Sequence, residues 1–226
     1  MALLSDRHRF LFILNPRTAS SALARALSAA TDARPFPEAP VLDASGRIAV
    51  AAKHGTIRQI REAGLLDDRA LAGLFKLVVV RNPYDSLVSL WTKLAGNPDY
   101  HALLGDPESW VHRKPGFAEK LRRSAGLGFA DWVRQEYGPR AEAGRTLAMN
   151  LKFARGTDRR LRYERLAAEL AGIAPRLGLP EGFALPRFNV TEVRQGRDYR
   201  AYYDATARDI AARVFAPELD RLGYDF

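Results

Sequence analysis

A short stretch near the N-terminus combines residue types that bind anions. Residues 15–21 read Asn-Pro-Arg-Thr-Ala-Ser-Ser and lie between an apolar run and an alanine-rich helical pattern. A strand-to-helix turn leaves backbone N–H groups unpaired at the positive end of the helix dipole, so the added guanidinium and three hydroxyls predict an anion-binding loop. The loop has no Walker A pattern and no lysine. These residues alone are equally consistent with a helix capped by Thr18 beside a solvated Arg17.

A second strand-to-helix junction carries a positive charge at the end of a buried strand. Arg81 directly follows the apolar run 75–80, and Ser89 lies about two helical turns further on. A buried arginine is costly unless its charge meets an anion or a carboxylate. Asp85 is a possible carboxylate partner in the same segment, so a ligand anion and an internal ion pair both remain open.

The elements that must position these junctions alternate between strands and helices. Short apolar runs predict strands at 9–14, 48–52, 75–80 and 159–163. Helical patterns follow at 18–30, 56–63, 129–137, 164–177 and 203–222, and from Pro83 with Asn82 as N-cap. Residues 31–47 and 180–199 read as connections, and 96–128 as a helical insertion with loops. This alternation predicts an α/β fold with a mostly parallel sheet, in which ligands lie at the carboxyl ends of the strands.

The size and composition of the chain exclude several classes of protein. The chain has 226 residues, 47% of them hydrophobic, and no internal repeat or linker divides it, which predicts one domain over 1–226. Cysteine is absent, which excludes disulfides, thiolate metal sites and a cysteine nucleophile. The longest apolar run, 10–14, is too short for a membrane span or a signal peptide, so we expect a cytoplasmic protein. The net charge is +9, but base composition of the genome can by itself make arginine and alanine frequent, so the charge is weak evidence and no nucleic-acid partner is expected.

Taken together, the two junctions resemble the sulfotransferases that use 3′-phosphoadenosine 5′-phosphosulfate (PAPS), in their bacterial and carbohydrate-type branches. Residues 16–21 (PRTASS) resemble the family's 5′-phosphosulfate loop. Residues 81–91 (RNPYDSLVSLW) resemble its 3′-phosphate motif, with the arginine-to-serine spacing 89 − 81 = 8. Three later segments agree in order and type: 162–166 (RYERL), 193–197 (VRQGR) and 222–226 (LGYDF).

The resemblance implies a P-loop-NTPase-like three-layer fold, PAPS as donor, PAP as product and no metal. It implies that Arg17 stabilises the leaving phosphate and that further residues bind the donor. These are Thr18, Ala19, Ser20 and Ser21 at the 5′-phosphate, Arg81, Ser89 and Arg194 at the 3′-phosphate, Tyr163 near the adenine, and Gln195 and Gly196 in the closing loop. Ala19 stands where glycine is usual, and Gln195 replaces a basic residue.

His54 is the candidate general base for an acceptor hydroxyl. It lies in Lys53-His54-Gly55-Thr56, where a predicted strand ends and a helix begins, and related members often carry a histidine there. A neutral imidazole suits proton abstraction near pH 7. The 48–52 strand is expected to run parallel beside the first strand, which would place His54 at the same edge as PRTASS. A capping or surface histidine is the alternative, and Glu164 is a competing base.

The sequence therefore predicts a sulfotransferase that moves a sulfonate group from PAPS to a hydroxyl acceptor by in-line displacement. The acceptor is open, with a carbohydrate as one possibility, and 96–157 is the expected acceptor-side region. A nucleotide kinase would need a Walker lysine and a magnesium-binding carboxylate, and neither is evident. The other alternative is a non-catalytic protein that binds PAP or anionic polymers.

Overall fold

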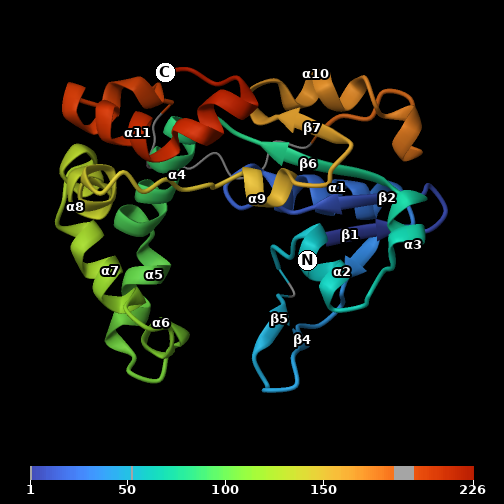
Figure 1. Ribbon diagram of the computed structural model, residues 1–226, viewed down its shortest axis with the longest axis horizontal. Coiled ribbons are helices and arrows are strands. Elements are labelled where there is room, and N and C mark those ends of the chain that lie inside the picture. The colour runs from blue at the N-terminus through green and yellow to red at the C-terminus, as the bar shows by residue number, and fades with distance from the viewer. Residues whose placement is uncertain (1, 52, 186–195) are drawn as a thin grey trace. The chain divides into compact units, whose positions relative to one another are not determined.

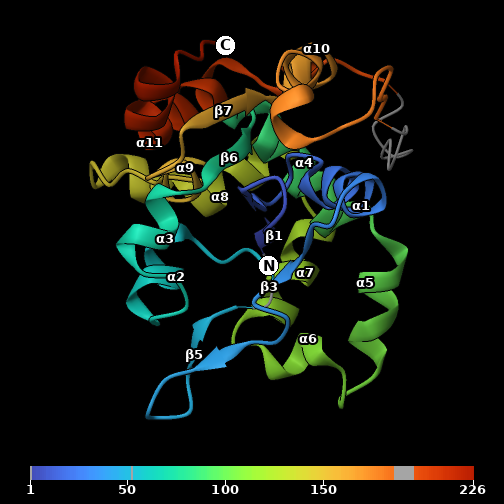
Figure 2. The same ribbon diagram turned by 90° about the vertical axis from the view of Figure 1, so that its right-hand side faces the viewer.

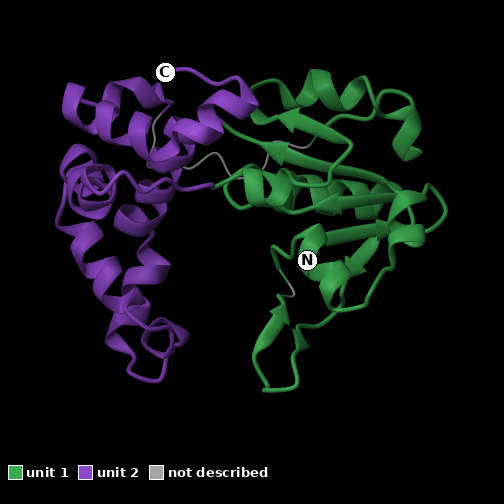
Figure 3. Cartoon of the chain, viewed as in Figure 1, with its two compact units in different colours: residues 1–81, 149–189 green, residues 82–148, 190–226 purple. Residues whose placement is uncertain are grey.

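The computed structural model describes residues 2–51, 53–185 and 196–226, which form two compact units. Unit 1 comprises residues 1–81 and 149–189, and unit 2 comprises residues 82–148 and 190–226 (Figure 3). The chain thus leaves unit 1 directly after Arg81 and returns to it at Met149.

Unit 1 is built on a five-stranded sheet with the order β3-β1-β2-β6-β7 (Figure 1). The strands are β1 (Ala2–Ser5), β2 (Phe10–Ile13), β3 (Arg34–Phe36), β6 (Phe75–Val80) and β7 (Arg159–Arg162). β2 is parallel to β6 and β6 to β7, while β1 is antiparallel to both β2 and β3. Four of the five strands therefore run in one direction, which confirms the predicted α/β fold with a mostly parallel sheet.

Helices cover both faces of this sheet. Figure 2 shows α1 (Ser20–Ala30) and α10 (Leu166–Ala171) on one side of the strands. It shows α2 (Ile57–Glu62), α3 (Asp68–Ala72) and α9 (Leu151–Ala154) on the other. Alternate residues of a strand point to opposite faces, and a strand covered on both faces must be apolar throughout, as β2 is. The three layers form the P-loop-like arrangement that the resemblance implied.

The core of unit 1 lies between the sheet and the α1–α10 layer. Phe10 and Phe12 of β2 pack there with Leu23 and Leu27 of α1, and all four side chains are fully buried. Full burial of each such side chain stabilises the fold by about 1.5–3 kcal/mol. This layer holds β2 and α1 together, and so fixes where the loop between them begins and ends.

The predicted position of the 48–52 strand is wrong. Ile48–Val50 forms β5, which pairs antiparallel with β4 (Val41–Leu42) in a separate two-stranded sheet. Both places beside β2 are taken, one by the more apolar β6 and the other by β1. β5 exposes Ile48 and contributes only Val50 to the buried interior, so it lacks the apolar character that a position covered on both faces requires.

Two further expectations need correction. Residues 31–47 are not only connection, because they contain β3 and β4. The helix predicted at 164–177 is divided into a 3₁₀ turn (Tyr163–Arg165), α10 and a second 3₁₀ turn (Pro175–Leu177). Gly172 ends α10, and Pro175 begins the next turn, where its fixed φ and missing N–H are tolerated.

Unit 2 is helical in its described part. It contains α4 (Pro83–Gly96), α5 (Pro98–Ala102), α6 (Trp110–Arg113), α7 (Phe117–Ala125), α8 (Phe129–Glu142) and α11 (Ala205–Leu222), with short 3₁₀ turns at Leu103–Gly105 and Tyr199–Tyr202. The predicted cap of α4 is confirmed, since Asn82 accepts a hydrogen bond from Tyr84 N at 3.0 Å and Pro83 opens the helix.

An aromatic cluster holds the end of the chain inside unit 2. The ring of Phe226 lies 5.0 Å from that of Tyr84 and 5.4 Å from that of Tyr203, in edge-to-face geometry. Tyr203 donates its hydroxyl to Tyr84 O at 2.9 Å, and burial raises the pKa of Tyr203 well above its usual range. The Leu-Gly-Tyr-Asp-Phe ending therefore packs against the start of α4.

Candidate active site

The loop between β2 and α1 has a backbone shaped for anion binding. Arg17 and Ala19 both adopt the left-handed conformation, with φ of 66° and 56°, and Thr18 between them does not. Alternation of this kind turns successive backbone N–H groups toward one concave side, as in anion-binding nests. The same N–H groups lead into α1, whose positive dipole end also favours an anion.

The helix that follows is not capped by a side chain of the described residues, and its first turn holds no acidic residue. The alternative in which Thr18 caps the helix is therefore wrong. Thr18 and Ser20 instead direct their buried hydroxyls to Asn15 O, at 2.8 and 2.7 Å. These two hydrogen bonds stabilise the loop on its buried side, while Ser21 is partly exposed at the start of α1.

Arg81 lies at the end of β6 and is held on two sides. Only 5% of its surface is exposed. Its Nη1 donates to Arg17 O at 2.9 Å, and its guanidinium carbon lies 4.1 Å from the ring centroid of Tyr163. The register explains the stacking, because Val80 pairs with Arg162 and the next residues of the two strands are Arg81 and Tyr163. The carboxyl ends of β2, β6 and β7 thus bring Arg17, Arg81 and Tyr163 together.

The other expected donor-binding residues lie elsewhere in the chain. Ser89 is buried on α4, and Gly196 is an exposed residue with φ of 71°; both belong to unit 2. Asp85 lies in the first turn of α4, where a carboxylate complements the helix dipole. Arg194 and Gln195 lie outside the described residues, so their roles stay predictions.

His54 reaches the end of β2 although its strand does not pair there. Its Nδ1 lies 2.9 Å from Leu14 O, directly before the anion-binding loop, and its ring packs edge-on against Phe153 of α9 at 6.4 Å. A carbonyl oxygen only accepts hydrogen bonds, so Nδ1 carries the proton and Nε2 is the basic nitrogen of the neutral ring. A neutral ring in this orientation has an unprotonated Nε2.

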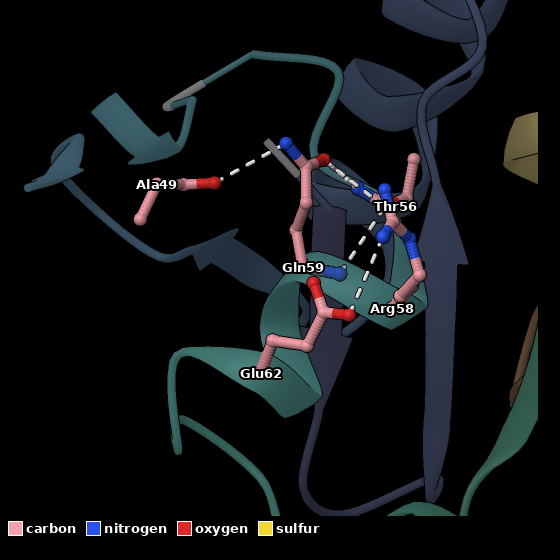
Figure 4. A network of polar contacts seen from close by, with 5 residues as sticks. All are labelled: Ala49, Thr56, Arg58, Gln59 and Glu62. Atoms are coloured by element: carbon pink, nitrogen blue, oxygen red, sulfur yellow. Dashed lines mark hydrogen bonds and ion pairs between the residues drawn. The ribbon is translucent and has the colours of Figure 1, made fainter. Parts of the chain in front are cut away.

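The segment after His54 is anchored by the start of α2 (Figure 4). Thr56 and Gln59 form a capping box, in which Gln59 N donates to Thr56 Oγ1 at 3.2 Å and Thr56 N donates to Gln59 Oε1 at 3.0 Å. Gln59 Nε2 also donates to Ala49 O at 3.2 Å, which ties β5 to α2 (Figure 4). These bonds hold both ends of the segment that carries His54.

Two buried asparagines contact the site, and the sequence analysis assigned no role to either. Asn15 and Asn150 are 2% and 1% exposed, and Asn15 Nδ2 donates to Asn150 Oδ1 at 2.7 Å. Asn15 is the first residue of the loop motif and could have been singled out as a buried amide at a strand end. Asn150 comes from a distant part of the chain and no local pattern marks it.

The comparisons with known proteins identify the family of this chain. A family model described as "Sulfotransferase family" matches residues 1–222. The match covers nearly the whole chain, so the chain belongs to the sulfotransferase family. Its class of reaction is the transfer of a sulfonate group, which implies an acceptor hydroxyl. Neither the curated proteins nor the solved structures include a significant match to this sequence.

The described residues contain neither a membrane-spanning helix nor a cluster of metal-binding side chains. Over 2–51, 53–185 and 196–226, no helix combines the length and the apolar character needed to cross a bilayer. Over the same ranges, His, Asp and Glu side chains form no group of three that could hold a metal ion.

The strained alanine of the loop gives a first prediction. An alanine in the left-handed region costs about 1 kcal/mol relative to glycine. Ala19→Gly should therefore raise the free energy of unfolding by about 0.5–1 kcal/mol and the melting temperature by about 1–4 °C. Ala29→Gly, at an exposed position of the same helix, is the matched control and should lower stability instead. Equal destabilisation by both changes would show that Ala19 is not strained.

Proposed function

We propose that this sulfotransferase uses PAPS as its donor and transfers the sulfonate group to a hydroxyl acceptor, releasing PAP. One observation carries the proposal. In unit 1 the nest of N–H groups at residues 17–19, the start of α1 and the guanidinium of Arg81 meet at the carboxyl ends of parallel strands. Residues 15–21 include no carboxylate that would oppose an anionic ligand.

The expected site residues would serve a donor with phosphate groups at both its 5′ and 3′ positions. The backbone N–H groups of residues 17–21 and the side chain of Ser21 would hold the 5′-phosphosulfate end. Arg81, Ser89 and Arg194 would hold the 3′-phosphate. When bound, PAPS supplies an activated sulfonate group and a phosphate leaving group. Arg17 would stabilise the negative charge that develops on that leaving phosphate. A transfer of this kind depends more on such electrostatic stabilisation than on covalent chemistry.

The remaining residues of the expected set would complete the donor site. Thr18 and Ser20 would act mainly by bracing the loop, because both hydroxyls approach Asn15 O. Ala19 would contribute its backbone. Tyr163, which stacks on Arg81, would lie near the adenine, and Gln195 and Gly196 would belong to the closing loop.

His54 is proposed as the general base. Its Nε2 would take the proton of the acceptor hydroxyl, while the bond from Nδ1 to Leu14 O keeps the ring in the required tautomer. The acceptor would be a hydroxyl compound, with a carbohydrate as one possibility, and residues 96–157 would contribute to its binding.

The donor assignment is tested by the ligand selectivity of the folded protein. PAP should raise the melting temperature, and AMP should do so far less, because each charge-assisted hydrogen bond to the 3′-phosphate contributes roughly 1.5–3 kcal/mol. Adenosine 2′,5′-bisphosphate carries the same phosphate groups with one at the wrong position and is the matched control ligand. Equal shifts with PAP, AMP and the 2′,5′ isomer would reject the proposed 3′-phosphate site.

A non-catalytic PAP-binding protein is the second candidate, and one observation favours it. Two hydroxyls of the loop are turned to Asn15 O, and alanine occupies the usual glycine position. Transfer of radiolabelled sulfonate from PAPS to any member of a broad panel of hydroxyl compounds would establish the enzyme. PAP binding with no transfer to that panel would favour the binding protein.

A further inference from the structure

We propose that Asn150 is a positioning residue that sets the two anion-binding junctions of unit 1 relative to each other. The role concerns the donor site and in that respect rests on the proposed function. Asn150 touches neither the expected donor nor the acceptor directly; it acts through the backbone of Arg81 and the side chain of Asn15.

The contacts of Asn150 join the ends of two strands. Its Oδ1 accepts from Asn15 Nδ2 at 2.7 Å and from Arg81 N at 3.2 Å, and its Nδ2 donates to Arg81 O at 3.1 Å. Asn15 Nδ2 also donates to Val79 O at 2.9 Å. Asn15 follows β2 by two residues and Arg81 directly follows β6, so the amide of Asn150 bridges the beginnings of both junctions.

The chemistry of these contacts requires an asparagine. The N–H and C=O of Arg81 face the same side, where a neighbouring strand would pair with them, and the side-chain amide offers one acceptor and one donor in their place. Both lone pairs of Oδ1 and both hydrogens of Asn15 Nδ2 are used by these bonds. An aspartate keeps the acceptor but loses the donor, and an alanine loses both.

Asn150 affects the candidate site through the side chain of Arg81. Its guanidinium donates to Arg17 O and stacks on Tyr163, so the backbone of Arg81 decides where that charge is held. Without Asn150, the buried Arg81 N–H and the Asn15 amide would each lose a partner. The two junctions would then be joined by fewer bonds, those from Asn15 Nδ2 to Val79 O and from Arg81 Nη1 to Arg17 O. Small displacements of a positioned group are costly in binding and catalysis.

The test compares Asn150→Ala with Ser5→Ala. Ser5 is also fully buried, and its hydroxyl donates to Asp32 and accepts from His8 N. It pairs with Phe10, the first residue of β2, and so lies at the end of that strand away from both junctions. Ser5→Ala therefore removes buried polar bonds from the same unit without touching either junction. The measurements are the dissociation constant for PAP and the backbone hydrogen exchange of Arg81.

We expect Asn150→Ala to weaken PAP binding about ten- to hundredfold and to speed exchange at Arg81, while Ser5→Ala changes neither. Equal PAP affinity and equal exchange in the two variants would overturn the proposal. Should wild-type protein fail to bind PAP, the proposed donor is wrong. The positioning role is then decided by exchange alone: protection of Arg81 lost only in Asn150→Ala supports it, and protection kept there rejects it.

Asn150→Asp adds a pH-dependent measurement that a purely structural role of Asn150 would not change. The same variant replaces Asn150→Ala if the alanine variant does not fold. The carboxylate cannot donate to Arg81 O, but its protonated form can. PAP affinity of this variant relative to wild type should therefore recover as the pH falls through the pKa of the introduced carboxyl. A ratio that stays constant with pH would contradict the role assigned to the donor hydrogen bond.

Discussion

Replacing His54 by asparagine should lower sulfonate transfer by about a hundredfold or more and leave PAP binding intact, because a general base typically contributes about 10²–10⁴-fold. Asparagine is the replacement that changes the local structure around His54 least. It tolerates the left-handed backbone, where His54 has φ of 68°, and its amide N–H can still donate to Leu14 O. The variant thus keeps the backbone conformation and the hydrogen bond to Leu14 O, and it removes the basic nitrogen together with the ring contact to Phe153.

Lys53→Ala is the control for this experiment. Lys53 is exposed directly beside His54, so removing its charge tests whether any change in this segment disturbs the site. It should alter transfer only slightly, whereas His54→Asn should lower the turnover number with little change in PAP affinity. If His54→Asn transfers sulfonate at nearly the wild-type rate, the base lies elsewhere. Glu164, exposed in the turn after β7, or a residue of 96–128 would then be the better candidate.

Replacing Arg17 by alanine should lower turnover by about 10²–10³-fold and weaken PAP binding much less. The reason is that its charge acts mainly when the leaving phosphate becomes more negative, so its effect is larger in the transition state than in the bound ground state. Steady-state kinetics with a working acceptor, together with direct titration of PAP, measure the two quantities separately.

Two variants serve as controls for Arg17. Arg17→Lys keeps the positive charge and should retain much of the turnover. Arg25→Ala removes a charge from an exposed position of α1 and tests whether any loss of positive charge near the loop has the same effect. A variant of Arg17 that loses PAP binding but turns over normally once saturated would show that Arg17 is a binding residue rather than a catalytic one.

Much of the fold could be predicted because its signals are local. The run 75–80 became β6, the run 9–14 became β2, and Asn82-Pro83 capped α4, since apolar runs and caps act over a few residues. β1 has a weaker local signal, because the polar Ser5 ends its short apolar part, Ala2–Leu4. The pairing of β5 was predicted wrongly because competition for a place beside β2 depends on the other strands, which no single segment reveals.

The sequence by itself determined the class of this protein. Apolar strands that alternate with helices predicted the α/β fold, and the segments 16–21 and 81–91 resemble two motifs of the sulfotransferases. The residue types alone left a capped helix and an internal ion pair open as alternatives. The tertiary structure decided which groups meet. It turned the hydroxyls of Thr18 and Ser20 inward, carried His54 to Leu14 from a strand outside the main sheet, and inserted Asn150 beside Arg81. The contacts of His54 and Asn150 join residues 40 and 69 positions apart, and each depends on the packing that satisfies a buried polar group, which local sequence does not encode.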